Sequence, residues 1–152
     1  MNKIIISDTS CLIALSRIGR IDILQKVFTI VYTTKIVARE FEDILPDWIK
    51  IKDFVNDTQF ENLKLILDAG EASAIALALE TDNCILIIDE KKGRKVAADL
   101  NLTIVGTLKV LLFAKNKDVI DSVKQVIIEL QKCSFRFNKV IVDEILRLAG
   151  EE

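Results

Sequence analysis

The sequence contains no histidine among its 152 residues. This absence excludes a Ser-His-Asp triad, a Cys-His pair and every zinc site that uses histidine ligands. It also removes the side chain that most often serves as a general base near neutral pH. Any hydrolytic chemistry must therefore use carboxylates, lysine, cysteine or a hard metal ion.

Cysteine is also scarce, with three residues at no recognisable metal or disulfide spacing. Cys11 and Cys84 stand in apolar runs, where a free cysteine behaves as a small hydrophobic residue, so both are expected in the core. The odd count favours a reducing compartment. No apolar run approaches the ~18 residues of a membrane span, and no cleavage-type signal follows the apolar start, so a cytoplasmic location without membrane contact is expected.

Proline- and glycine-rich linkers, internal repeats and low-complexity stretches are absent from the sequence, which has one proline and five glycines. The length and the 51% apolar content suit one compact domain over residues 1–152. The net charge of −2 excludes a nonspecific binder of polyanions, so nucleic-acid binding would require a local basic patch. No glycine-rich nucleotide loop is present.

Short apolar runs alternate with segments of helical spacing along the chain. Strands are predicted at residues 3–7, 28–34, 47–55, 84–88 and 103–106. Helices are predicted at 9–16, 21–26, 35–45, on both sides of Ala69–Gly70 within 61–82, at 91–100 and 108–114, and as a pair joined near Ser134. This alternation indicates an α/β fold whose parallel sheet is covered by helices on both faces.

Four acids occupy positions that such a fold brings to one edge of the sheet. Asp8 and Asp89 come directly after buried strands, Glu40 lies in the helix after the second strand, and Glu71 lies in the first turn of its helix. Ligands of open α/β sheets bind at the carboxyl ends of the strands. Converging carboxylates repel one another unless a cation neutralises them, and oxygen ligands favour Mg²⁺ or Mn²⁺. The pattern therefore favours a metal-dependent phosphodiester reaction.

Each of these acids also has a purely structural interpretation. Asp8 and Asp89 are each suited to cap the helix that follows. Glu40 shares its helix with further acids and fits a solvated face. Asp68 and Glu71 have the spacing of a capping box. If all these interpretations hold, the chain is a non-catalytic module that binds RNA or a protein.

A cluster of basic residues follows Asp89. Lys91, Lys92, Arg94 and Lys95 lie at the start of a predicted helix, where the helix dipole disfavours cations. Binding of phosphate groups would explain why cations stand at this helix start. Arg94 is the best candidate for a phosphate contact, because its guanidinium fork matches the geometry of a phosphate.

The motifs IIISDTSCLIAL, TTKIVAREFE, GEASAIALALE and LIIDEKKGRKVAADLNLTIVGTLKVLL, in this order, resemble those of PIN domains. The resemblance extends over about residues 3–115, the expected catalytic core, and the predicted C-terminal helices at about 118–149 also fit. It implies a three-layer α/β/α sandwich with a central parallel sheet. It further implies an Mg²⁺- or Mn²⁺-dependent ribonuclease.

The resemblance assigns catalytic and metal-binding roles to matching positions. The acids that match are Asp8, Glu40, Glu71 and Asp89. Ser10 and Thr107 are expected to hydrogen-bond metal-bound waters or substrate, and Lys92 and Arg94 to contact substrate. Thr107 stands where some PIN domains have a further acid or a hydroxyl. The resemblance therefore leaves open whether the site holds one metal ion or two.

The leading hypothesis is thus an endoribonuclease that cleaves RNA with metal-activated water. Many PIN domains are toxins of toxin–antitoxin pairs, so an antitoxin protein and a homodimer are the implied partners. A different enzyme class is aspartyl phosphotransfer, similar to that of haloacid-dehalogenase-like phosphatases. The sequences of those phosphatases also have an aspartate after the first strand. The phrase DTS at Asp8 lacks the second acid two residues on, which disfavours that class.

Overall fold

An all-parallel sheet of five strands forms the centre of the computed structural model, which describes residues 4–152. The strands are β1 (Ile4–Ser7), β2 (Ile30–Thr33), β3 (Ile49–Ile51), β4 (Cys84–Ile87) and β5 (Ile104–Val105). Their spatial order is β3-β2-β1-β4-β5, with β1 in the middle. The first predicted strand begins at residue 3, which lies outside the described residues.

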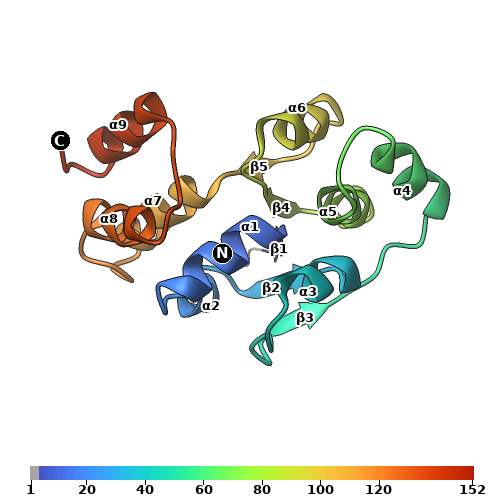
Figure 1. Ribbon diagram of the computed structural model, residues 1–152, viewed down its shortest axis with the longest axis horizontal. Coiled ribbons are helices and arrows are strands. Elements are labelled where there is room, and N and C mark those ends of the chain that lie inside the picture. The colour runs from blue at the N-terminus through green and yellow to red at the C-terminus, as the bar shows by residue number, and fades with distance from the viewer. Residues whose placement is uncertain (1–3) are drawn as a thin grey trace.

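Helices connect successive strands and extend the chain beyond the sheet. They are α1 (Thr9–Arg17), α2 (Asp22–Val27), α3 (Lys35–Phe41), α4 (Asp57–Lys64), α5 (Ala69–Leu79), α6 (Lys91–Asp99), α7 (Thr107–Asn116), α8 (Val123–Lys132) and α9 (Lys139–Leu148). Figure 1 shows α1, α2, α7 and α8 on one side of the sheet and α4, α5 and α6 on the other. Helix α3 follows β2 and lies next to both α1 and α5.

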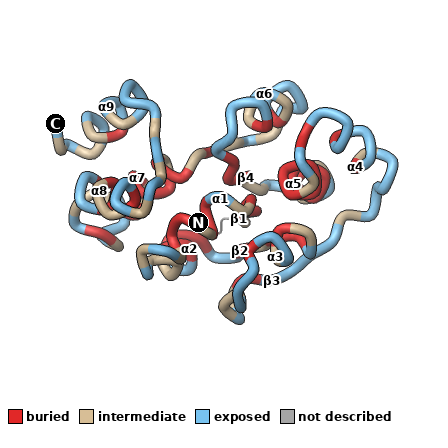
Figure 2. The backbone as a smooth tube through the Cα atoms, viewed as in Figure 1, coloured by how far each residue is buried: buried red, intermediate tan, exposed pale blue. Residues whose placement is uncertain are grey.

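The two-residue alternation of the strands explains these layers. Alternate residues of a strand point to opposite faces of its sheet. Ile5, Val31 and Ile87 belong to the core shared with α1, α2, α7 and α8. Ile6 and Leu86 belong to the core shared with α4, α5 and α6. Burial is concentrated along the sheet and α5, whereas α9 is largely exposed (Figure 2). The predicted three-layer α/β/α sandwich is confirmed.

Three sequence expectations differ from the structure in their details. The helix predicted over 35–45 ends at Phe41, because Glu42 adopts a left-handed conformation with a φ of 60°. The strand predicted over 47–55 is restricted to Ile49–Ile51. Cys11 is buried as predicted, but Cys84 is only half-buried against the core.

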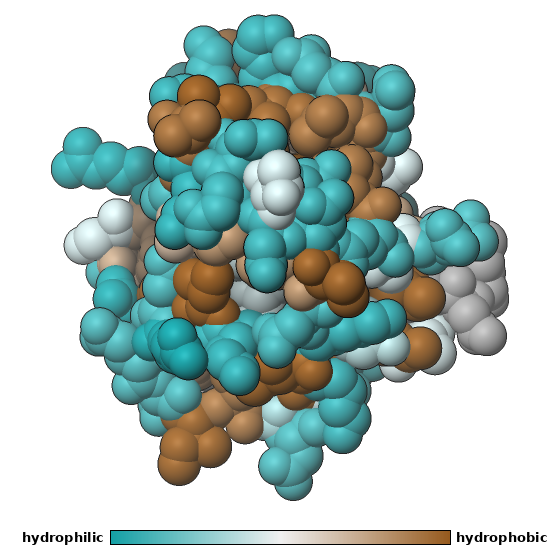
Figure 3. Space-filling model, turned by 90° about the vertical axis from the view of Figure 1, so that its right-hand side faces the viewer, coloured by the Kyte–Doolittle hydropathy of each residue, from teal (hydrophilic) through white to brown (hydrophobic). Residues whose placement is uncertain are grey.

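The surface around α4 carries several exposed apolar side chains. Figure 3 shows apolar patches among polar side chains on the side of the molecule that carries this helix. Val55 and Leu65, which flank α4, are 85% and 82% exposed. Within residues 4–152, no helix has both the length and the apolar character needed to cross a bilayer.

Candidate active site

The carboxyl ends of β1 and β4 place Asp8 and Asp89 at the same edge of the sheet. These strands are parallel neighbours, with Ser7 paired to Ile87. The backbone N–H of Asp8 extends the ladder by donating to the carbonyl of Ile87 over 3.1 Å. The chain order of the strands, read as a parallel sheet, therefore predicted this common location correctly.

Asp8 combines a structural role with an unfavourable electrostatic environment. It is the N-cap of α1, and its Oδ1 accepts a hydrogen bond of 2.7 Å from the backbone N–H of Thr9. The side chain is buried. Burial raises the pKa of the Asp8 carboxyl to about 7 despite that hydrogen bond, and the negative charges of nearby acids raise it further. The capping interpretation is confirmed, and it leaves one carboxylate oxygen uncommitted to the cap.

Glu40 approaches this edge from α3. Its Oε1 accepts a hydrogen bond of 2.7 Å from the hydroxyl of Thr9, the residue after Asp8. The same carboxylate lies against the backbone of Gly70 at the start of α5, where a Cβ would come within 2.0 Å of Oε1. Although Glu40 is exposed, these two contacts hold it beside Asp8 and α5, and the solvated-face interpretation does not account for them.

Glu71 is the most constrained acid of the group. Its backbone N–H donates to Oδ1 of Asp68 over 2.8 Å, which is one half of the predicted capping box. Its side chain is 6% exposed, and Oε2 has no hydrogen-bond partner within residues 4–152. The pKa of the Glu71 carboxyl is raised to about 8. Burial is the largest cause, and the neighbouring acids Asp68, Asp8 and Glu90 raise the pKa further. A buried polar atom without a partner is uncommon and calls for a ligand, a water or an ion.

Asp68 and Glu90 are acids of this edge that the sequence analysis did not assign to the site. Among the charges that raise the pKa of Asp8, that of Asp68 has the largest effect, and it also acts on Glu71. Glu90 contributes to the field at Glu71. The spacing of Asp68 and Glu71 drew attention to a capping box, although the same helix start carries both carboxylates to the sheet edge.

Asp89 is held by the helix after β5. Its Oδ1 accepts a 2.8 Å hydrogen bond from the backbone N–H of Thr107, and its Oδ2 accepts from the Thr107 hydroxyl. The expectation that Asp89 caps the helix containing Arg94 is therefore wrong. Glu90 caps that helix instead, by accepting from the backbone N–H of Gly93 over 3.1 Å. Thr107, which is buried, thus fixes the orientation of Asp89.

Three of the four predicted substrate contacts lie beside Asp89, and the fourth does not. Nη1 of Arg94 donates to the carbonyl of Ile88 over 2.9 Å, which holds the guanidinium at the end of β4. Ser10, Arg94 and Thr107 line a cleft together with Asp89. Lys92 is exposed and does not belong to the lining of this cleft, whereas Lys91 does.

The residues present suit a hard divalent cation in their chemistry. All the candidate ligands are carboxylate oxygens, the type that Mg²⁺ and Mn²⁺ prefer. The unpartnered Oε2 of Glu71 and the raised pKa values of Asp8 and Glu71 are what a cation would relieve. Over residues 4–152, however, no three His, Cys, Asp or Glu side chains stand close enough together to form a complete metal-binding group.

The structure thus combines a parallel α/β/α sandwich with acids at the carboxyl edge of its sheet. A family model for the PIN domain matches residues 4–151, so the chain belongs to the PIN domain family. PIN domains are generally nucleases that act on nucleic acids, and they generally use divalent metal ions. A search of curated proteins gave no match. The family assignment favours the nuclease hypothesis over aspartyl phosphotransfer.

Proposed function

We propose that this chain is a metal-dependent endoribonuclease whose metal ligands are Asp8, Glu40, Glu71 and Asp89, with Mg²⁺ or Mn²⁺ as the ion. The observation that carries the proposal is the buried Oε2 of Glu71, which lacks a partner within residues 4–152 at the acidic sheet edge of a PIN domain. Asp68 joins this group, because its charge acts on both Asp8 and Glu71.

The residues around the acids have separable tasks. When bound, a divalent cation neutralises the carboxylates, activates water for attack on phosphorus and stabilises the charge that develops on the phosphate. Thr9 holds Glu40, and Thr107 holds Asp89. Arg94, anchored at the carbonyl of Ile88, presents its remaining guanidinium N–H groups to a phosphate.

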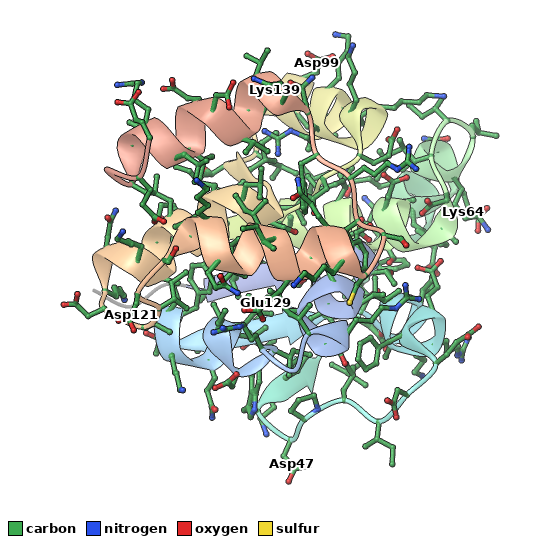
Figure 4. The ribbon with its side chains drawn as sticks, turned by 60° about the vertical axis from the view of Figure 1, so that its left-hand side comes forward. Asp47, Lys64, Asp99, Asp121, Glu129 and Lys139 are labelled. Carbon is green, nitrogen blue, oxygen red and sulfur yellow. The ribbon has the colours of Figure 1, made fainter. Side chains whose placement is uncertain are left out.

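The first experiment measures Mn²⁺ binding by calorimetry and cleavage of a single-stranded RNA, with wild type beside Asp8→Asn and Asp89→Asn. Both variants are expected to lose metal-dependent cleavage while keeping the circular dichroism spectrum of the wild type. Asp121→Asn is the matched control, because Asp121 is exposed just before α8 (Figure 4) and follows the end of α7 opposite to Thr107. If both active-site variants bind Mn²⁺ and cleave RNA as the wild type does, the assignment is refuted.

The proposal includes a biological partner. The protein would act as the toxin of a toxin–antitoxin pair, held inactive by an antitoxin protein, and would form homodimers. Support comes from exposed apolar residues in and near the edge strand β3: Ile44, Ile51 and Val55 are 91%, 54% and 85% exposed. An unpaired sheet edge with apolar neighbours is suited to pairing with another chain. Light scattering of the purified protein tests the homodimer, and an Ile44→Ser variant that stays dimeric would place the interface elsewhere.

A further inference from the structure

The two threonines that open the segment TTKIVAREFE are buried where β2 joins α3. Thr33 ends β2, and Thr34 is the N-cap of α3, the helix that carries Glu40. Both threonines are fully buried. A buried hydroxyl is tolerated only where it is hydrogen-bonded, so an apolar side chain would be the simpler choice at such positions. The partners of these hydroxyls therefore indicate what the two threonines do.

The hydroxyl of Thr34 belongs to a hydrogen-bonded chain that crosses from α3 to α5. Its Oγ1 accepts from the backbone N–H of Val37 over 3.1 Å and lies 2.7 Å from Oγ of Ser73, which is also fully buried. The Ser73 hydroxyl donates to the carbonyl of Gly70 over 2.8 Å. Because a hydroxyl has one proton, this donation leaves Thr34 as the donor to Ser73. The chain thus runs in one direction and uses both hydroxyl protons.

This chain ends at the part of α5 that lies against the acids. Gly70 directly precedes Glu71, and the carboxylate of Glu40 lies against the backbone of Gly70. On α3, Glu40 follows Val37 by almost one helical turn. Helices α3 and α5 pack against each other, and α5 is buried along most of its length (Figure 2). The hydroxyl pair therefore fixes the helix that carries Glu40 against the helix start that carries Glu71.

The hydroxyl of Thr33 makes a corresponding connection to the end of β1. Its Oγ1 donates to the carbonyl of Ser7 over 2.9 Å. The hydroxyl of Ser7, which is also fully buried, donates to the carbonyl of Asp8 over 2.9 Å. The adjacent threonines thus connect α3 both to the strand end at Asp8 and to the start of α5.

We infer that Thr33, Thr34 and Ser73 are positioning residues of the candidate site, and we call them the hydroxyl clasp. The clasp holds together the three elements that carry Asp8, Glu40 and Glu71, and it acts through these elements rather than by contact with the ion. The inference rests on the proposed function. Neighbouring carboxylates repel one another, which pushes the elements that carry them apart. Directional hydrogen bonds between buried groups oppose such a displacement and fix one arrangement.

The first test compares Ser73→Ala with Thr81→Ala in Mn²⁺ calorimetry and RNA cleavage. Thr81 provides the matched control, because its hydroxyl donates to the carbonyl of Leu77 over 2.8 Å at the other end of the same helix. Ser73→Ala is expected to raise the Kd for Mn²⁺ about tenfold, the effect typical of losing a group that orients metal ligands. It should also lower kcat while leaving the KM for RNA unchanged. Thr81→Ala is expected to change neither, even where it lowers Tm as much.

Conservative variants separate the effect of the hydroxyl from that of side-chain volume. Thr34→Ser keeps the hydroxyl and should bind Mn²⁺ as the wild type does, whereas Thr34→Val keeps the shape and should bind as weakly as Ser73→Ala. The double variant Thr34→Val/Ser73→Ala should bind no more weakly than Thr34→Val, because either substitution already breaks the chain. Thr33→Val removes the separate bond to Ser7 and should weaken Mn²⁺ binding further.

Amide hydrogen exchange of the metal-free protein tests the clasp without metal or activity. In Ser73→Ala, the backbone N–H groups of Val37 and Glu71 should exchange faster relative to those of β4, because the contact of α3 with α5 opens locally. Thr81→Ala should leave that ratio unchanged.

The outcomes separate the clasp from the proposed function. If Ser73→Ala binds Mn²⁺ as the wild type does, or if Thr81→Ala loses as much affinity, the clasp is overturned and the nuclease proposal stands. A Thr34→Ser variant as weak as Thr34→Val also overturns the clasp. A wild type that neither binds Mn²⁺ nor cleaves RNA overturns the nuclease proposal. The exchange ratio then decides: a local increase in Ser73→Ala supports the clasp, and a uniform increase along the chain overturns it.

Discussion

Replacing Glu71 by glutamine should stabilise the metal-free protein while removing a metal ligand. The folded state holds this carboxyl with its pKa raised from 4.5 to about 8, because the side chain is buried next to other acids. Glutamine keeps the shape of the side chain but never ionises. The substitution therefore removes the free-energy cost of keeping a carboxyl protonated at neutral pH.

The sign and size of the effect follow from proton linkage. Below a pH of about 4.5 the carboxyl is protonated in both the folded and the unfolded state, so wild type and Glu71→Gln should have the same stability. Above it the unfolded chain releases the proton, while the folded protein retains it until about pH 8. The wild type then loses about 1.4 kcal/mol of unfolding free energy per pH unit. The variant should be more stable by about 3 kcal/mol at pH 7, or roughly 6–12 °C in Tm.

Urea denaturation in EDTA at several pH values measures this difference, with the fluorescence of the single tryptophan, Trp48, as the signal. Glu61→Gln, which removes an exposed carboxylate on α4, is the control and should show no comparable pH dependence. With Mn²⁺ at ~100 times its Kd the wild type should gain about 2.7 kcal/mol, and Glu71→Gln should gain much less. A variant that is less stable at pH 7, or a difference that does not change with pH, refutes the reasoning about Glu71.

Three further substitutions test other contacts. Gly93→Ala should destabilise the fold by about 1–3 kcal/mol in urea denaturation, since its Cβ would lie 2.8 Å from Oε2 of Glu71 and 2.6 Å from an isoleucine methyl. Thr107→Val should lower the rate of RNA cleavage more than it lowers stability, because it removes the hydroxyl that orients Asp89. Glu151→Ala should cost about 1–3 kcal/mol, because Glu151 accepts hydrogen bonds from Lys115 and the start of α8.

Each of these has a result that contradicts it. A Gly93→Ala protein with wild-type stability would mean that the side chains of Ile88 and Glu71 both move aside without cost. Thr107→Ser, which restores the hydroxyl, should recover cleavage, and a failure to do so would attribute the defect to packing. The lowered pKa of Glu151, about 2, means that its contribution is present above pH 4.5 and fades as the pH falls toward 2. A Glu151→Ala penalty of the same size at pH 2 and pH 7 would contradict that assignment.

The sequence by itself determined the layers of this protein and the location of most of its acids. Apolar runs that end in Asp8 and Asp89 specify parallel strands whose carboxyl ends share an edge. The uninterrupted apolar runs at residues 4–6 and 84–88 specify strands that are buried on both faces, and therefore helices on both sides of the sheet. These features are local, because strand periodicity, helix spacing and the residue after a strand are all read along the chain.

The tertiary structure decided which groups face one another. Asp89 accepts hydrogen bonds from Thr107, the first residue of α7, because β4 and β5 are neighbours in the sheet. The chain between them gives no sign of this contact. The carboxylate of Glu40 lies against the backbone of Gly70, although the two residues are far apart in the sequence. Asp68 gained its electrostatic importance only through burial of Asp8 and Glu71 beside it.

The cleft beside Asp89 shows the same division most clearly. Phe135, Arg136 and Phe137, which belong to its lining, read in the sequence as part of a connection between two helices. Only the packing of α9 against α7 brings this connection opposite Asp89 and Arg94. Side-chain types and their spacing determine the chemistry that a segment can offer. Long-range packing free energy, which no local pattern reports, determines what that chemistry is placed against.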